Sequence, residues 1–426
     1  MRVVVGTTTP IFGGGVEART LDVEDVIRVP TIRGHLRWWW RALFGDRYGP
    51  QELYEAEVRR WGGIVGDEVR RSAVTVTVSV RPSRPERRER HRGDPNIDYV
   101  TWPSKMPDRV PLRDPGVVFD LGLDVQEHGT IGMDRDALTD EIRDSVVAWI
   151  LFGGYGGRTR RGMGGLTVVE SPAEWLPSSA TPDRIRACFR RARPLTDSAV
   201  TKGSLQVPRL AGATLYTNHR TGPDAIAAWS NAVAWLREFR QGVELGARQP
   251  GRAPEEGRPS VSNWPEADKV RHLSRRRDLK PHRPRHDDQP SWPRAAFGLP
   301  IGGRFQCQGR RDRERGGEGE RYVEPDDYWI SWEDETGLRD RLASPLILKA
   351  LPLANGTFAP IALWLARSSP PKGQVVMCLG SRERVCPGSH TTFDAPLVAP
   401  GDACLLPILE QHSTMREAFL GWLSEH

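Results

Sequence analysis

Long apolar runs are missing from this sequence. A membrane-spanning helix needs about eighteen or more apolar residues in a row, and the most apolar stretch, residues 342–366, is interrupted by Lys349, Pro352 and an Asn-Gly pair. The N-terminal segment 1–6 has a short apolar run and no cleavage site, so it is not typical of an export signal. We therefore expect a cytoplasmic protein with no membrane partner.

Cysteine motifs and catalytic signatures are also lacking. The five cysteines form an odd set without a C-x-x-C pair, which argues against a disulfide framework and against a structural zinc site. The ten histidines are scattered, and the H-E-x-x-H and G-x-S-x-G motifs are absent. The sequence therefore predicts no metal site and no cofactor.

Lysine is scarce, and arginine supplies most of the positive charge. The 426 residues have a net charge of +6, and only six of the 61 basic side chains are lysines. Residues 81–92 carry a net charge of +4 and residues 266–286 carry +5, so these segments are predicted to attract a polyanion. Two alternatives stay open: a GC-rich genome favours arginine everywhere, and proline-interrupted charged runs are often solvated loops.

The first part of the chain has a recognisable order of elements. The periodicity predicts strands and helices in the order strand, helix, strand, strand, helix, strand, at residues 3–9, 32–44, 73–80, 117–125, 135–152 and 166–169, with Thr31 capping the first helix. This order is that of a ferredoxin-like fold, an antiparallel sheet with both helices on one face. We therefore expect an α+β domain over residues 1–172, with an insertion at about 81–115 and an open sheet face, as in RNA-recognition modules.

The remaining residues repeat this pattern more loosely. The sequence predicts a helix at 224–240, a hairpin of strands 345–353 and 358–365 around an Asn-Gly turn, a strand at 375–379 and a C-terminal helix at 408–425. We expect a second, more divergent domain of the same class over residues 194–426, with insertions at about 242–262 and 274–294. The predicted fold class is thus two tandem ferredoxin-like domains with long charged insertions.

The first helix carries a row of arginines. Arg33, Arg37 and Arg41 recur every four residues, which places them about 6 Å apart along the helix, close to the spacing of phosphates in a single strand. Trp38 lies off the apolar stripe and could stack on a base. The alternative is a solvated arginine face with a partly covered tryptophan.

A glycine-rich segment, residues 153–165, contains seven glycines around three arginines. Glycine lets a backbone approach a ligand, so its N–H groups could contact phosphates that the arginines neutralise. The segment is neither a Walker loop nor a dinucleotide fingerprint, because it follows a helix and precedes a strand. Its predicted RNA-binding residues are Gly156, Gly157, Arg158, Thr159, Arg160, Arg161 and Gly162. The alternative is a connector with incidental charge.

Two further features lie near these elements in the expected fold. Gly13, Gly14 and Gly15 form a turn after the first strand, within reach of the same ligand. His35 lies between the arginines of the first helix. It could act as a general base in metal-free RNA cleavage, although a histidine beside arginine is more often a phosphate or base contact.

These motifs resemble a known family. The runs Thr-Pro-Ile-Phe-Gly-Gly-Gly at 9–15 and Ile-Arg-Gly-His-Leu-Arg-Trp-Trp-Trp-Arg at 32–41 are similar to motifs of the RAMP superfamily of CRISPR-associated proteins. The segment 153–166 is similar to its glycine-rich loop. Blocks at 239–242, 264–268, 297–301 and 344–346 resemble the subunit-one proteins of type III-B (Cmr) effector complexes. His35 departs from the glutamine expected at its position in that motif.

The resemblance implies a non-catalytic RNA-binding subunit that caps the 3′ end of the CRISPR RNA and engages paired target RNA in antiviral defence. Its implied partners are CRISPR RNA, target RNA and other Cmr subunits, and Arg33, Arg37, Arg41 and residues 158–161 match the RNA-contacting elements. Two alternatives remain. One is a metal-independent CRISPR RNA-processing endoribonuclease that uses His35, and the other is a scaffold that touches only protein.

Overall fold

The computed structural model describes most of the chain, in two compact units. The described residues are 1–13, 15–16, 20, 22, 24–82, 93–104, 112–126, 134–196, 207–241, 258–259, 264–274, 282–283, 286–305, 325, 327–367, 372–380, 382, 384–393, 395, 397 and 407–425. Unit 1 comprises Met1–Trp235 and Leu346–Arg367, and unit 2 comprises Leu236–Pro345 and Ser368–His426. Both units combine helices and sheets, so the chain is an α+β protein.

The first sheet of unit 1 is antiparallel and has four strands. These strands are β1 (Arg2–Thr7), β5 (Val74–Val80), β7 (Val118–Val125) and β8 (Leu166–Val168). Their order in the sheet is β5-β7-β1-β8. With the helices that separate them along the chain, this is the strand order of a ferredoxin-like module. All four predicted strands are confirmed to within two residues.

Two helices cover one face of this sheet. They are α1 (Val29–Phe44) and α4 (Arg135–Phe152), and α4 has the bounds that its periodicity predicts. The predicted start of α1 is wrong. The helix begins at Val29 with Pro30 in its first turn, where the missing N–H of proline costs nothing. Thr31 is therefore inside the helix and is not its cap.

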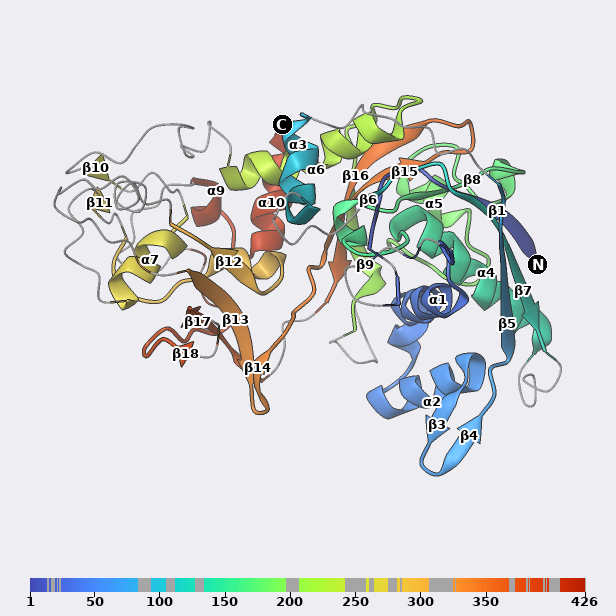
Figure 1. Cartoon of the computed structure of the whole chain (residues 1–426), viewed down its shortest axis with the longest axis horizontal. Coiled ribbons are helices and arrows are strands. Elements are labelled where there is room, and N and C mark those ends of the chain that lie inside the picture. The colour runs from blue at the N-terminus through green and yellow to red at the C-terminus, as the bar shows by residue number, and fades with distance from the viewer. Residues whose placement is uncertain are drawn as a thin grey trace. The chain divides into compact units, whose positions relative to one another are not determined.

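A second sheet lies on the other side of these helices. It consists of β9 (Arg209–Tyr216), β15 (Leu346–Pro352) and β16 (Phe358–Ala366), in the order β15-β16-β9. Helix α1 packs against β5 and β9, and α4 packs against β7, β8 and β15. The helices thus lie between two sheets (Figure 1), and one apolar core joins all three layers. The predicted hairpin β15–β16 is confirmed, with Gly356 at φ +79° in its turn.

The open face of the first sheet is polar. Thr75 and Thr77 on β5 are exposed while Val74 and Val76 between them are buried. Asp120 on β7 forms ion pairs with Arg2 at 2.6 Å and with Arg81 at 2.8 Å, and Arg81 also pairs with Glu170. These contacts hold the pKa of Asp120 well below its usual range. This face therefore shows ion pairs where an RNA-recognition module carries stacking aromatics.

A helix and a hairpin that the sequence analysis missed follow α1. They are α2 (Pro50–Trp61) and the pair β3 (Gly63–Val65) and β4 (Glu68–Arg70), and a short turn η1 (Gly45–Arg47) precedes them. Pro50 occupies the first helical position, and the Glu52 carboxylate accepts the N–H of Gly49 at 3.0 Å. Both features are start signals that the sequence carries. Trp61 at the end of α2 is fully buried in the core.

The insertion predicted at 81–115 contains ordered elements. They are α3 (Pro95–Thr101), the turn η3 (Trp102–Ser104) and β6 (Leu112–Arg113), which pairs with β2 (Ile11–Phe12). Asp94 caps α3, and Val100 packs with Met163 and with Trp229 of α6 (Ala225–Gln241). Most of the basic segment 81–92 lies outside the described residues.

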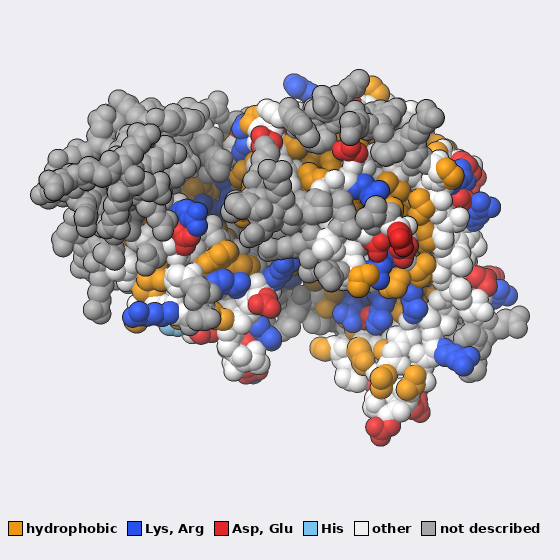
Figure 2. Space-filling view, in the orientation of Figure 1, with side chains coloured by type: hydrophobic (Ala, Val, Ile, Leu, Met, Phe, Trp, Pro, Cys, Tyr) orange, Lys and Arg blue, Asp and Glu red, His pale blue; other side chains and the backbone are white. Residues whose placement is uncertain are grey.

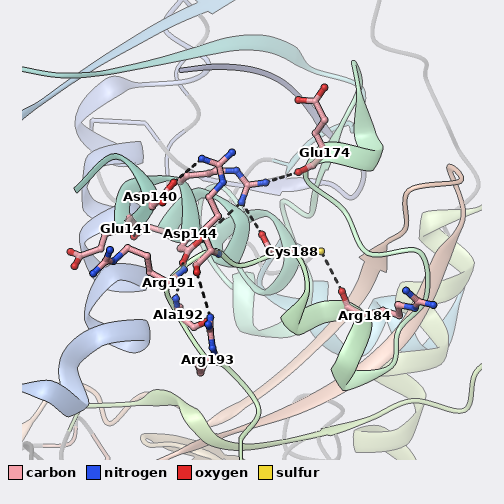
Figure 3. A network of polar contacts seen from close by, with 12 residues as sticks. Asp140, Glu141, Asp144, Glu174, Arg184, Cys188, Arg191, Ala192 and Arg193 are labelled. Atoms are coloured by element: carbon pink, nitrogen blue, oxygen red, sulfur yellow. Dashed lines mark hydrogen bonds and ion pairs between the residues drawn. The ribbon is translucent and has the colours of Figure 1, made fainter. Parts of the chain in front are cut away.

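The segment after β8 packs against α4. This segment includes η6 (Pro172–Glu174) and α5 (Pro182–Arg186). The fully buried Asp144 accepts the backbone N–H groups of Arg190, Arg191 and Ala192, each at 2.8 Å (Figure 3). Arg143 donates to the carbonyls of Cys188 and Glu174. One buried carboxylate thus accepts three backbone amides, which fixes the segment against α4.

Unit 2 contains a five-stranded sheet and several short helices. Its elements are α7 (Glu266–Leu273), η7 (Pro293–Phe297), β10 (Arg258–Pro259), β11 (His282–Arg283), β12 (Ile301–Gly303), β13 (Tyr328–Asp334), β14 (Gly337–Arg339), β17 (Gln374–Leu379), β18 (Arg384–Val385), α9 (Pro407–Glu410) and α10 (Met415–Glu425). The sheet order is β12-β13-β17-β18, with β14 beside β13. The predicted strand at 375–379 is confirmed as part of β17.

The predicted C-terminal helix is wrong in one respect, because it consists of α9 and α10. Thr414 starts the second helix: its hydroxyl accepts the N–H of Glu417 at 3.2 Å, and the Glu417 carboxylate accepts the N–H of Thr414 at 3.1 Å. This reciprocal arrangement is a capping box, and it is visible in the sequence as Thr-Met-Arg-Glu.

Part of the basic segment 266–286 is not a solvated surface. Lys269 and Arg271 of α7 are buried, and they pair with Asp287 and Asp268.

Among the residues that the structure describes, no helix is long and apolar enough to cross a membrane. The two-domain division at residues 172 and 194 stays a prediction, since unit 1 also contains β9, most of α6, β15 and β16.

Candidate nucleic-acid interface

The first helix and the glycine-rich segment meet in unit 1. The guanidinium carbon of Arg160 lies 5.3 Å from the ring centre of Trp38 on α1, a cation–π distance. Arg160 belongs to the short turn η5 (Thr159–Arg161), which follows α4. Two groups of predicted site residues, far apart in the sequence, are thus neighbours in the fold.

The arginine row of α1 is braced by α2. The Nε of Arg37 donates to the Glu57 carboxylate at 2.6 Å, Arg41 pairs with the other oxygen of Glu57, and Arg33 donates to the Trp61 carbonyl at 2.7 Å. Glu57 is 2% exposed, whereas the side chains of Arg37 and Arg41 are 33% and 38% exposed. Figure 2 shows Lys and Arg side chains gathered over the region of α1. Glu57 therefore holds two of the three arginines, the Trp61 carbonyl holds the third, and the row keeps a net positive charge.

Trp38 is less open than its place off the apolar stripe predicts. The side chain is half-buried, and its ring meets Trp39 edge to face with centroids 4.6 Å apart. Arg160 covers another part of the ring. Trp38 therefore forms one side of the surface around Arg160.

The glycines of the glycine-rich segment serve close packing. Gly162 has φ +80°, and a Cβ there would lie 2.4 Å from the Trp229 side chain and 2.8 Å from the Leu348 carbonyl oxygen. The N–H of Gly157 donates to the Phe12 carbonyl at 2.7 Å, and that of Gly162 donates to the Thr159 carbonyl at 3.0 Å. The predicted phosphate cradle does not include these two amides, because both are already engaged.

The three arginines of this segment have different surroundings. Arg158 has φ +55° and donates to the Val100 carbonyl at 3.1 Å. Its guanidinium lies 5.7 Å from the Phe12 ring and 5.6 Å from the ring of Trp102. Arg161 donates to the Leu346 carbonyl at 3.0 Å. For Arg160, burial and then the charge of Arg367 lower the pKa to about 10, so the guanidinium keeps its charge at neutral pH.

Trp102 was missed by the sequence analysis. It is 51% exposed, and it lies in an insertion that its charged flanks mark as a loop. An exposed tryptophan beside an arginine is a common base-stacking arrangement. The only sequence signal for it is an aromatic residue within a charged, proline-rich segment.

The turn at residues 9–15 packs directly against the glycine-rich segment. The Thr9 hydroxyl donates to the Gly162 carbonyl at 2.6 Å and accepts the N–H of Gly165 at 2.7 Å. Gly13 has φ +60°, and the N–H of Gly15 donates to the Thr20 carbonyl at 2.9 Å. Gly14 lies outside the described residues. The turn therefore stands beside the glycine-rich segment, as the expected fold requires.

His35 occupies a largely apolar position. Its ring stacks on Trp149 with centroids 6.0 Å apart and meets Tyr155 edge-on at 6.1 Å. Its Nε2 atom is buried and has no hydrogen-bond partner in the described part of the chain. Burial lowers the pKa of His35 to about 4. The imidazole is therefore neutral at neutral pH and is a weak base.

A pocket adjoins His35. Its volume is about 190 Å³, and its lining comes from α1, the end of α4, η5 and β15: His35, Trp38, Trp39, Phe152, Gly153, Gly154, Thr159, Arg160 and Ile347. The aromatic rings supply flat apolar walls, while His35, Thr159 and Arg160 supply polar groups. The described residues contain no group of three or more His, Cys, Asp or Glu side chains that could hold a metal ion.

Lys349 on β15 fixes the start of the glycine-rich segment. It is fully buried, and its Nζ donates to the carbonyls of Ile150 at 2.5 Å and Gly153 at 2.7 Å. Burial lowers the pKa of Lys349 to about 7. Two of its N–H groups are therefore used by carbonyls at this helix end. No local pattern indicates this role, because the other residues of the strand that contains Lys349 are apolar.

One family model matches the part of the chain that contains the candidate interface. Residues 5–167 match the RAMP superfamily. The match covers less than half of the chain, and we call these residues the RAMP region. The RAMP region contains α1, the glycine-rich segment and the turn at residues 9–15, which together form the candidate interface.

One curated relative matches part of the chain. The chain is 27% identical over 166 residues to the CRISPR system Cmr subunit Cmr1-1 of Pyrococcus furiosus. The match covers 38% of this chain and 45% of that protein, so it spans less than half the length of the relative.

Two solved structures align with most of the chain at low identity. The crystal structure of Cmr1 from Pyrococcus furiosus (apo form) has a TM-score of 0.42 and 16% identity, and the match covers 86% of this chain and 88% of that one. A chain in the cryo-EM structure of the Type III-B Cmr-beta bound to cognate target RNA has a TM-score of 0.43 and 10% identity, with 99% of each chain covered.

Proposed function

We propose that the chain is a non-catalytic RNA-binding subunit of a type III-B CRISPR effector complex that acts in the cytoplasm. In this role it holds the 3′ end of the CRISPR RNA and engages the paired target RNA, next to other Cmr subunits. The RAMP region and the similarity to a Cmr1 subunit support the choice of complex. RNA contact is supported by the chemistry of the interface.

The contact between Arg160 and Trp38 is the observation that carries the proposal. It joins two arginine-bearing elements into one surface. Arg37 and Arg41 keep about a third of their side chains exposed there. Guanidinium groups bind phosphates through charge and paired hydrogen bonds, and aromatic rings beside them stack on bases. RNA offers phosphates to the guanidinium groups and bases to the aromatic rings.

The state of His35 favours binding over cleavage. A general base works best with a pKa near the operating pH, whereas burial lowers the pKa of His35 to about 4. Its ring is also wedged against Trp149 and Tyr155. The endoribonuclease alternative predicts metal-independent cutting of a repeat RNA by the purified protein, and we expect none.

We also propose that β9, α6, β15 and β16 belong to a second ferredoxin-like module. Along the chain they follow the order strand, helix, strand, strand, and in their sheet the order is β15-β16-β9. Both orders equal those of the first three strands and first helix of the first module, in which β5, β7 and β1 are adjacent. The repeat supports tandem modules.

Binding to a short single-stranded RNA tests the proposal. The double variant Arg37→Ala/Arg160→Ala removes one cation from each element. We expect about tenfold weaker binding and a log–log salt slope shallower by about 1.4, since each phosphate contact with single-stranded RNA contributes about 0.7. Fluorescence anisotropy over a range of potassium chloride concentrations measures both quantities.

Arg59→Ala/Arg70→Ala is the matched control, because both side chains are exposed and lie on α2 and β4. This control should bind RNA as the parent protein does. Unchanged affinity in the Arg37/Arg160 variant, together with impaired assembly of the complex, would instead support a scaffold that touches only protein. In the assembled complex, photocrosslinks from the 3′ part of the CRISPR RNA should fall in peptides 31–47 and 153–165.

A further inference from the structure

The insertion between β5 and β7 presents an exposed aromatic ring. Trp102 is 51% exposed, and it begins the turn η3 directly after α3. Among the cation–π contacts of the described residues, its ring is the only one that belongs to an exposed residue. The ring therefore offers a flat apolar surface to a ligand in solution, next to a positive charge.

Helix α3 holds this ring in a fixed place. Ile97 and Val100 of the helix are buried in an apolar cluster that includes residues of α6. The Asn96 side chain also donates to the Ser230 hydroxyl of α6 at 3.0 Å. A binding residue whose support is already ordered loses less conformational entropy when the ligand arrives.

Arg158 connects Trp102 to the glycine-rich segment. Its guanidinium carbon lies 5.6 Å from the ring centre of Trp102 and 5.7 Å from that of Phe12. Its Nη1 donates to the Val100 carbonyl of α3 at 3.1 Å. A Cβ at Gly157 would lie 3.0 Å from the Phe12 ring, so glycine lets the segment pack closely there. The exposed ring is thus adjacent to an element of the proposed RNA surface.

Two arginines of this segment contact two different tryptophans. Arg160 lies 5.3 Å from the ring centre of Trp38 on α1, whereas Arg158 lies beside Trp102. Trp102 is the more exposed of the two rings. Two residues of backbone span at most about 7 Å, so a single RNA strand can contact both arginines.

The pairing of ring and cation favours a nucleobase over an apolar protein side chain. Every base has a π-face that stacks on an aromatic ring, and each base is linked to a phosphate. A guanidinium group beside the ring can neutralise that phosphate. An aliphatic side chain of a protein partner would use the ring and leave the cation without a role.

We propose that Trp102 is a base-stacking residue: one unpaired base of the bound RNA stacks on its exposed ring, and a phosphate of the same strand contacts Arg158. This inference rests on the proposed RNA-binding function and adds a base contact to it. The insertion thereby becomes part of the RNA surface, together with α1 and the glycine-rich segment.

Two ligands separate base stacking from phosphate binding. One is a short uniform RNA, and the other is a chain of the same length made only of abasic ribose phosphates. The full-length parent protein should bind the base-containing RNA more tightly. In Trp102→Ala the ratio of the two affinities should fall about tenfold, because the stacking contact is lost. The salt slope should stay unchanged, since no charge is removed.

Three further variants control this experiment. Trp102→Phe keeps an aromatic ring, so it should retain most of the affinity ratio. Tyr54→Ala removes another exposed aromatic side chain of unit 1, on α2, and it should leave the ratio unchanged. Arg158→Gln should weaken both chains and make the salt slope shallower by about 0.7. Photocrosslinks from 5-iodouridine RNA should appear in peptide 93–105 of the parent protein and disappear in Trp102→Ala.

The outcomes distinguish this inference from the proposed function. Equal binding of the two chains by the parent protein overturns base stacking and leaves the proposed function intact. Binding of neither chain overturns the proposed function, and the role of Trp102 with it. Equal weakening of both chains in Trp102→Ala assigns Trp102 a structural role and overturns the inference. Unchanged RNA affinity in Trp102→Ala with impaired assembly of the complex assigns the ring to a protein partner and overturns it too.

Discussion

Glu57 sets how much positive charge the first helix presents. The carboxylate is 2% exposed and pairs with both Arg37 and Arg41. Two cations around one anion leave a net charge of +1, and each guanidinium still has an exposed face. A buried carboxylate between two arginines also fixes their direction, since each side chain would otherwise sample many rotamers.

Glu57→Gln should strengthen RNA binding and weaken the fold. The substitution removes the negative charge, so the salt slope should become steeper by up to about 0.7. The loss of two charge-assisted hydrogen bonds should lower the free energy of unfolding by about 1–3 kcal/mol. Anisotropy and urea denaturation measure the two effects.

Glu55→Gln on the same helix is the control, because Glu55 contacts only Gln51 among the hydrogen bonds of the described residues. It should change neither quantity. Weaker RNA binding by Glu57→Gln would show that orientation of the arginines matters more than their charge.

His35 should make stability depend on pH in an acidic window. Burial lowers its pKa to about 4 from an unfolded value of 6.5, so between these values the unfolded chain binds more protons. The contribution of His35 to stability is therefore complete above pH 6.5 and falls by about 3 kcal/mol as the pH decreases to about 4. Below that value it has no further effect.

Comparison with His35→Phe separates the contribution of His35 to stability from that of carboxylates that titrate in the same pH range. The free energy of unfolding of the parent protein, measured by urea denaturation, should fall more steeply than that of the variant over this window. Parallel pH profiles would mean that the imidazole is solvated.

At the scale of elements, the glycine-rich segment is a packed connection between α4 and β8. Gly162 combines a left-handed backbone with contact to Trp229, and the Trp229 Nε1 donates to the Arg161 carbonyl at 2.6 Å. Lys349 holds the other end of the segment by the Ile150 and Gly153 carbonyls. The segment is thus fixed at both ends by residues from later in the chain.

Gly162→Ala should be much more costly than Gly66→Ala. Both glycines have positive φ, but a Cβ at Gly66 would meet nothing within 4 Å, whereas one at Gly162 would overlap Trp229 and Leu348. We expect a loss of about 1 kcal/mol for Gly66→Ala from the backbone alone and a further 1–3 kcal/mol or so for Gly162→Ala from overpacking. Denaturant unfolding of the two variants provides the measurement, and equal losses would contradict the packing role.

At the scale of the whole chain, unit 1 is built from two separate stretches of sequence. The hairpin β15–β16 lies at residues 346–366, yet Ile347, Leu351 and Leu363 are buried in the same core as α1 and α4. The buried pair of Arg60 and Glu141 ties α2 to α4 at 2.8 Å within this unit. The RAMP region at residues 5–167 is therefore only part of a folding unit.

A fragment that ends at residue 235 should fail to fold cooperatively. Without the hairpin, one side of the helix layer would expose a large apolar surface, and the carbonyls that Lys349 satisfies would lose their partner. The same fragment joined by a flexible linker to residues 346–367 should recover a single cooperative transition in circular dichroism. A cooperative transition in the shorter fragment would show that the first module is independent.

Local sequence patterns predicted much of the first module. The alternation of valine and threonine at 74–80 and the apolar spacing in α4 specify those elements, because each depends only on the period of the backbone. Helix α2 and the capped start of α10 also carry local signals, which the sequence analysis overlooked. The open sheet face was expected to receive RNA, but Arg2, Arg81 and Asp120 fill it with ion pairs.

The sequence by itself determined which residue types could meet RNA: a row of arginines at helical spacing and a segment of arginines among glycines. Only the tertiary structure decided which of these side chains are paired, packed or charged. Glu57 pairs with the row from another helix, Lys349 reaches the glycine-rich segment from about two hundred residues away in the chain, and burial removes the charge of His35. These outcomes depend on contacts between distant residues and on desolvation, and neither is encoded in a local period.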